Sequence, residues 1–115
     1  MMLSVPEKDL WILGGAVKTP PMSREARKEV GGLLRMLQRG HRLSMPVSRP
    51  MPGIGPRCHE LRVPDGDVVW RVFYRLDEAA VLVLEVLKKK TQKTPKSTID
   101  VCKARLKEWE REQGG

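Results

Sequence analysis

The clearest pattern in the chain is a strict alternation of side chains from Val68 to Leu76, which is typical of a β-strand with two unlike faces. One face is apolar and is expected to lie on the core: Val68, Trp70, Val72, Tyr74 and Leu76. The other face is expected to be open to solvent, and it carries Val69, Arg71, Phe73 and Arg75. Two guanidinium groups around an aromatic ring suit this face to contacts with phosphates and bases.

Three other stretches predict strands around this one. The stretch Cys58–Val63 comes before it, and an Asp-Gly pair within Pro64–Asp67 predicts a hairpin turn between the two. The unbroken apolar run Ala80–Leu87 follows it and predicts a strand buried on both faces. A further short strand is predicted at Asp9–Leu13, where two glycines end it.

Helical spacing of apolar residues predicts a first helix between Ser23 and Gly40, with these core positions: Ala26, Val30, Leu33, Leu34 and Leu37. Ser23 is a favourable N-cap, and Gly40 is a favourable C-terminal stop. Gly31 and Gly32 interrupt this helix at a cost of about 1 kcal/mol each relative to alanine. We expect close packing against another element to explain them.

A C-terminal helix is predicted by an apolar stripe at Ile99, Cys102, Leu106 and Trp109. Two N-caps fit it equally well. One is Thr94, with Pro95 at the first helical position, and the other is Ser97.

Together these elements predict an α+β fold, in which a small antiparallel sheet is covered by helices on one face and open on the other. The sheet is expected to contain a three-strand meander and the short N-terminal strand. The proline-rich segment His41–Pro56 is expected to be an extended loop without a core pattern. We expect one domain over residues 1–115, with flexible ends at residues 1–8 and 111–115.

The charge of the chain indicates what kind of partner it binds. The 115 residues include 22 Lys and Arg against 14 Asp and Glu, a net charge of +8. Five lysines lie between Lys88 and Lys96, directly after the buried strand. Because ammonium groups this close repel one another, we expect a polyanion to neutralise them, which favours nucleic acid as the partner. A solvated basic turn is the alternative.

Several other classes of protein are disfavoured. Cys58 and Cys102 form no disulfide framework, and no Cys or His spacing indicates a metal site, so we expect no metal and no cofactor. The chain has no apolar run long enough for a membrane span and no secretory signal, which predicts a cytoplasmic protein without a membrane partner.

From Trp11 to Glu108 the chain resembles the phage-derived branch of the RelE/HigB toxins of type II toxin–antitoxin systems, within the RelE/ParE superfamily. The resemblance is carried by four segments in the same order, namely Met51–Pro56, Glu60–Arg62, Trp70–Tyr74 and Lys89–Pro95. The last of these is the most specific, because it follows a predicted strand and precedes a predicted helix.

This resemblance implies a compact toxin that cleaves mRNA, often on the ribosome, without a cofactor. It also implies a cognate antitoxin, frequently with a helix-turn-helix domain, and a capacity for higher-order toxin–antitoxin complexes. We expect the antitoxin to cover the basic cleft or the first helix. Other members of the superfamily poison DNA gyrase, so the fold alone does not identify the target.

The chain departs from its relatives at two places. Relatives often carry His where this chain has Glu85, and an aromatic residue where it has Leu87. The predicted C-terminal helix also has no tyrosine, which some ribonucleases of the family use near their active site. An acid–base role at position 85 is therefore in question.

Metal-free RNA cleavage needs a base for the 2′-hydroxyl, cations for the charged phosphate and an acid for the leaving 5′ oxygen. We expect Arg71 to stabilise the phosphate and Arg62 to be the second cation, while Lys89, Lys90 and Lys93 clamp the backbone and one of them acts as the acid. The alternative is that Arg62 and Arg71 are ordinary surface arginines that form salt bridges with Glu60 or Glu85. His59 is the nearest imidazole, although strand alternation points it away from Arg62. The expected RNA-binding residues are Lys88, Lys90, Gln92, Lys93, Phe73, Arg75 and Lys96.

Three functions therefore compete. The leading one is an mRNA endoribonuclease toxin held by an antitoxin. The second is a toxin of the same fold that inhibits gyrase by binding, and the third is a phage-derived nucleic-acid-binding protein without catalysis.

Overall fold

The computed structural model describes residues 7–15, 22–89 and 93–114. Within them, five strands form one mixed sheet in the order β1-β5-β4-β3-β2. Strand β1 runs parallel to β5, and all other neighbours are antiparallel, so the predicted antiparallel arrangement holds for the meander but not for the N-terminal strand. The strands are β1 (Asp9–Ile12), β2 (Ser48–Pro50), β3 (Cys58–Asp65), β4 (Val68–Leu76) and β5 (Ala80–Lys89). A short 3-10 turn, η1 (Leu13–Gly15), and two helices, α1 (Arg24–Gln38) and α2 (Lys96–Gly114), complete the α+β fold that the sequence predicts.

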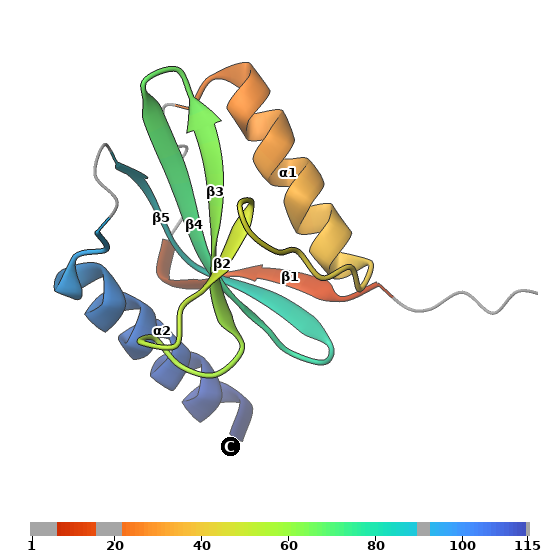
Figure 1. Ribbon diagram of the computed structural model, residues 1–115. Coiled ribbons are helices and arrows are strands. Elements are labelled where there is room, and N and C mark those ends of the chain that lie inside the picture. Colours follow the sequence, from red (N-terminus) through yellow and green to blue (C-terminus); the bar gives the residue numbers. More distant parts are fainter. Residues whose placement is uncertain (1–6, 16–21, 90–92, 115) are drawn as a thin grey trace, which may run out of the picture.

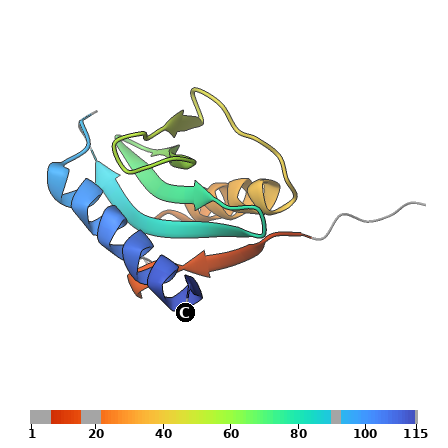
Figure 2. The same cartoon turned by 90° about the horizontal axis from the view of Figure 1, so that it is seen from below.

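The two helices lie on opposite faces of the sheet (Figures 1 and 2). Leu34 and Leu37 of α1 pack on one face, against Val72 and Tyr74 among others. Cys102 and Leu106 of α2 pack on the other face, in a cluster that includes Phe73. The prediction that one face stays open was therefore wrong. The apolar run of β5 required cover on both sides, and each helix supplies one side.

The α2 side of the sheet holds the largest single cluster of the buried core. Phe73 has no exposed surface, and it packs with Leu82, Leu84 and Cys58 beneath α2. Ile99 and Trp109 pack at the margin of the same cluster, so the predicted stripe of the C-terminal helix is confirmed. The helix begins at Lys96, one residue after Pro95.

A β-bulge in β5 changes which residues face α2. Phe73 lies opposite Glu85, whereas its neighbour Tyr74 lies opposite Val83, so Leu84 is an extra residue. The bulge shifts the alternation of every later residue of β5 by one. Leu87 therefore lies opposite Arg71 and Lys89 opposite Val69, both on the α2 side.

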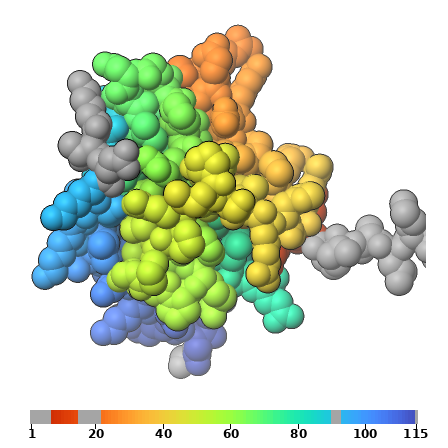
Figure 3. Space-filling view, viewed as in Figure 1, coloured from red at the N-terminus to blue at the C-terminus, as the bar shows by residue number. Residues whose placement is uncertain are grey.

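The segment between α1 and β3 is more ordered than the predicted loop. It contains β2, which pairs with β3, and it contributes buried side chains at Ser48, Met51 and Ile54. In Figure 3 this segment, coloured yellow to yellow-green, crosses the front of the molecule between α1 and α2. The prediction of a loop without core positions was therefore wrong.

The start of α1 is fixed to the β3–β4 hairpin. The Ser23 hydroxyl caps the helix by accepting from the Ala26 amide at 3.1 Å, and the Ser23 amide donates to Asp65 at 3.0 Å. Trp70 Nε1 donates to the same carboxylate oxygen of Asp65 at 2.8 Å. The turn itself is Gly66-Asp67, one residue later than the Asp-Gly pair predicts, with Gly66 at φ 66°.

Both ends of the described chain are better fixed than we expected. Lys8 donates its amide to the Gln38 carbonyl at 2.7 Å and its ammonium group to two carbonyls of the β4–β5 turn. Residues 111–114 continue α2. In the described part of the chain, no helix has the length and apolar character needed to cross a membrane.

Candidate functional site

Charged side chains from β2, β3, β4 and β5 meet on the α2 side of the sheet. We call this group the Glu60 cluster, and its members are Arg49, Glu60, Arg62, Arg71 and Lys89. The strand register explains the meeting. Arg49 lies opposite Glu60 and Arg62 lies opposite Arg71, while the bulge turns Lys89 to the same side. Four cations therefore share one carboxylate.

Glu60 lies at the centre of the cluster and has no exposed surface. One of its oxygens, Oε2, accepts from Arg71 Nη1 at 3.2 Å. The other, Oε1, lies 3.3 Å from Arg49 Nη2 and 4.0 Å from Arg62 Nε. A buried carboxylate needs cations and hydrogen bonds to replace its water. Here the cations supply the opposite charge and Oε2 has its hydrogen bond, whereas Oε1 has no hydrogen-bond partner in the described part of the chain.

Some donors of the cluster are not used by the described part of the chain. Arg49 Nε, Arg62 Nε and Lys89 Nζ are each buried and have no hydrogen-bond partner there. Burial lowers the pKa of Lys89, and so do Arg71 and Arg49, while Glu60 acts in the opposite direction. Buried donors without acceptors, together with an excess of positive charge, make this cluster suited to an anion such as a phosphate.

The members of the cluster differ in how far solvent reaches them. The side chains of Glu60 and Arg71 are 0% and 2% exposed, whereas those of Arg49 and Arg62 are 32% and 21% exposed. Lys89 is partly exposed as a residue, but its Nζ is buried. The two outer arginines can meet a ligand directly, and the inner Arg71–Glu60 pair holds them in place.

We expected Arg71 and Phe73 to lie on an open surface of the sheet, and this prediction was wrong. Arg71 lies with the predicted second cation, Arg62, but it is nearly buried and ion-paired to Glu60. Phe73 is fully buried in the core beneath α2, so the prediction that it stacks on RNA bases was wrong.

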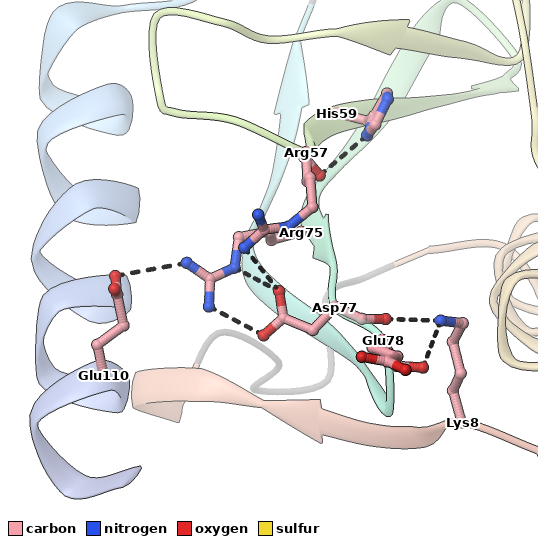
Figure 4. A network of polar contacts seen from close by, with 7 residues as sticks. All are labelled: Lys8, Arg57, His59, Arg75, Asp77, Glu78 and Glu110. Atoms are coloured by element: carbon pink, nitrogen blue, oxygen red, sulfur yellow. Dashed lines mark hydrogen bonds and ion pairs between the residues drawn. The ribbon is translucent and has the colours of Figure 1, made fainter. Parts of the chain in front are cut away.

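Arg75 is used to hold α2 onto the sheet (Figure 4). It donates two hydrogen bonds to Asp77, at 2.7 and 2.9 Å, and one to Glu110 of α2 at 3.4 Å. Because its donors are occupied inside the protein, we remove Arg75 from the candidate RNA-binding residues.

His59 lies on the opposite face of the sheet from the Glu60 cluster. Its ring stacks on Tyr74, with centroids 5.3 Å apart. Its Nδ1 lies 3.2 Å from the Arg57 carbonyl, a contact drawn in Figure 4. Tyr74 belongs to the core packed against α1. His59 is therefore not the base of this cluster, in agreement with its strand alternation.

The remaining predicted lysines are divided among several places. Lys88 is exposed on the α1 side, 6.0 Å from the ring centroid of Trp70. Lys93 and Lys96 are exposed just before α2 and at its first residue. Lys90 and Gln92 lie outside the described residues. Of the predicted site residues, the structure brings together Arg62, Arg71 and Lys89.

Sequence reasoning offered Glu60 only as a salt-bridge partner of Arg62 and Arg71, a pairing that the structure shows for Arg71, and it missed Arg49 altogether. Glu60 shares strand alternation with Arg62, which was a usable signal, whereas Arg49 lay in a segment that showed no strand pattern. Glu85, where relatives often carry His, is ion-paired to Arg105 of α2 at 3.2 Å. Arg105 also donates to the Leu84 carbonyl at 2.6 Å, so position 85 joins a helix to the sheet here.

No group of three or more His, Cys, Asp or Glu side chains in the described chain is arranged to hold a metal ion. Cys58 and Cys102 are buried thiols, and burial raises the pKa of Cys102 to about 12. Neither cysteine is therefore suited to act as a nucleophile near neutral pH.

Comparison with known proteins identifies a family. A family model described as "Phage derived protein Gp49-like (DUF891)" matches residues 21–107, most of the chain. The matched segment contains every residue of the Glu60 cluster, helix α1 and the strands β2 to β5. No curated protein matches this sequence.

Proposed function

The chain belongs to the Gp49-like family of phage-derived proteins, which is associated with toxin–antitoxin systems, and we propose that it is a toxin that cleaves RNA. The observation that carries the chemistry is the Glu60 cluster, where four cations surround one carboxylate. Such a site suits a phosphodiester, because its charge increases as the attacking oxygen adds to phosphorus.

The proposed reaction uses the RNA's own nucleophile. Glu60 accepts the proton of a 2′-hydroxyl, and the resulting oxygen attacks the adjacent phosphorus while the bond to the 5′ oxygen breaks. Lys89 donates a proton to the leaving oxygen, so the products are a 2′,3′-cyclic phosphate and a 5′-hydroxyl. A lowered pKa makes the Lys89 ammonium a better proton donor near neutral pH.

The arginines divide the remaining tasks. Arg49 and Arg62, which are partly exposed, bind the phosphate oxygens as they gain charge. Arg71 is a positioning residue, because its ion pair orients Glu60 at 3.2 Å. Glu60 has no exposed surface in this structure, so the RNA must displace the groups that cover its carboxylate before the proton can transfer.

The test is cleavage of a single-stranded RNA by the purified full chain in excess EDTA. The proposal predicts new fragments with cyclic phosphate and 5′-hydroxyl ends, and a loss of at least about tenfold in rate for Arg62→Gln, because one phosphate-binding cation is removed. Lys103→Gln, an exposed charge on α2, is the matched control. Equal rates in the two variants would contradict the proposal, and so would RNA that stays intact both here and in a translation reaction that contains ribosomes.

A second candidate is a toxin of the same fold that binds DNA gyrase without chemistry. The full burial of Glu60 favours it, because a base must reach its substrate. This candidate predicts growth arrest with intact mRNA and inhibited supercoiling by purified gyrase. Arrest with cleaved mRNA would exclude it.

The proposed partners follow from the same family membership. We propose translated mRNA on the ribosome as the substrate and a cognate antitoxin, with a helix-turn-helix domain, as the inhibitor. Co-purification with the product of the adjacent reading frame tests the second partner, and the complex should have no RNA-cleaving activity.

A further inference from the structure

The outer face of α1 carries two features that the proposed reaction does not use. The first is Gly31 and Gly32, which lie in the interior of the helix and are exposed to solvent. A methyl group added to either glycine would meet no atom within 4 Å. Our expectation of close packing inside the protein was therefore wrong, and nothing within the described chain compensates for about 1 kcal/mol lost at each position.

The second feature is a straight row of cations on the same face. Arg24, Lys28, Arg35 and Arg39 are all exposed, and their spacings of four, seven and four residues place them along one line of the helix. The row is about 22 Å long at 1.5 Å per residue. The glycine pair fills the interval between Lys28 and Arg35. We call this row and its glycines the α1 stripe.

The α1 stripe lacks acidic side chains along its centre. Glu25 and Glu29 project to one side of the line, where Met36 also lies, while the core positions of α1 point to the sheet. Arg39 pairs with Glu7 at 3.3 Å, but both side chains are more than half exposed, so this pair contributes little and is easily displaced.

We infer that the α1 stripe is a second RNA-binding surface, which takes the sugar–phosphate backbone of double-helical RNA. A protein partner would require an apolar centre in its interface, and the stripe offers charge instead. Cations on one line match a row of phosphates. The glycine pair leaves a notch in which a backbone ridge can approach the helix closely between Lys28 and Arg35.

This inference rests on the proposed function and extends it. The stripe and the Glu60 cluster lie on opposite sides of the sheet, so both can be occupied at the same time (Figure 1). Structured RNA held on the α1 side leaves the α2 side free for a single strand. The α1 side would therefore bind double-helical RNA, and the α2 side would bind a single strand.

The test measures binding of a fluorescent 16-base-pair RNA duplex to the full chain at several salt concentrations. Lys28→Gln/Arg35→Gln should weaken binding about tenfold at low salt and release about two fewer counterions per complex. Gly31→Gln/Gly32→Gln should weaken it several-fold while the helix becomes more stable, because the side chains fill the notch. Lys103→Gln/Lys107→Gln removes the same charge from exposed positions of α2 and is the matched control.

Three outcomes would overturn the inference. One is duplex binding by Lys28→Gln/Arg35→Gln within twofold of wild type, and another is an equal loss in the α2 control, which would make net charge the cause. The third is tighter binding of polyglutamate than of duplex at the same salt, which would indicate an acidic protein as the occupant. Cleavage of single-stranded RNA by the wild type is measured separately. If no cleavage is found, the duplex-binding measurements still test the α1 stripe on their own.

Discussion

Glu60 has the least favourable environment for its charge of any acidic residue described in the chain, since it is fully buried. Its stability there depends on arginines from the two neighbouring strands, at 3.2 Å for Arg71 and 3.3 Å for Arg49. At the residue scale, the cluster therefore contains two kinds of residue: buried ones that hold it together and partly exposed ones that can meet a ligand. Substitutions should therefore divide into those that unfold the protein and those that only inactivate it.

Arg71→Gln should destabilise the protein by about 3–5 kcal/mol, because it leaves the buried Glu60 carboxylate without its closest cation. Arg62→Gln, which removes a partly exposed group 4.0 Å from Glu60, should cost no more than about 1 kcal/mol. Urea unfolding of both variants measures the difference. Equal midpoints would show that the Arg71–Glu60 pair does not hold the cluster.

Lys89 should set the alkaline limit of RNA cleavage. Its protonated form is the proposed acid, so activity is lost as pH rises through its pKa, which is lower than the ordinary 10.5. The rate should therefore fall at a lower pH than an ordinary lysine would give, and Lys89→Arg should be slow and lack this fall. A pH–rate profile of both proteins provides the measurement, and an unchanged profile in Lys89→Arg would remove Lys89 as the acid.

At the scale of elements, the sequence predicts most strands and both helices well. Helical spacing and caps locate α1, and alternation locates β3 and β4. The placement of α2 was missed because Arg71, Phe73 and Arg75 read as a polar face. The unbroken apolar run of β5 was the contrary signal, since a strand buried on both faces needs two covers.

The candidate site was only partly predictable. Alternation correctly placed Arg62 with Arg71 and turned His59 away from them. The β-bulge that brings Lys89 to this side depends on tertiary packing of β5, and no local pattern indicates it. Arg49 joins the site through β2, a strand of three residues whose pairing depends on β3.

Gly31→Ala and Gly32→Ala should each stabilise the protein by about 1 kcal/mol, because alanine favours the helix and nothing obstructs its methyl group. Thermal or urea unfolding measures the gain. A loss of stability in either variant would contradict this prediction, because it would mean that the added methyl group meets another part of the protein.

Asp65 should make the joint between α1 and the hairpin sensitive to acid. Hydrogen bonds from Ser23 and from Trp70 hold the pKa of Asp65 below its ordinary 3.8. Its stabilising effect is therefore complete above that pH and is lost as the pH falls through the lower folded value. The unfolding free energy of Asp65→Asn should lack this part of the acid dependence, and identical acid profiles would refute the role.

At the scale of the whole molecule, the net charge of +8 is organised rather than spread evenly. Cations gather around Glu60 on the α2 side and along the outer line of α1 on the other side. The sheet lies between these two surfaces and fixes their relative positions. In our proposal, this protein of 115 residues acts on one strand of RNA while it holds another part of the same assembly.

The most direct test of the central claim, that the Glu60 cluster cleaves RNA, is induced expression of wild type and Arg62→Gln in parallel cultures. Growth is followed while the 5′ ends of cellular mRNA are mapped. The account predicts arrest with new 5′-hydroxyl ends inside reading frames for the wild type, and a strong reduction of both effects for Arg62→Gln at equal protein level. Arrest with intact mRNA, or cleavage in Arg62→Gln at the wild-type level, would contradict it.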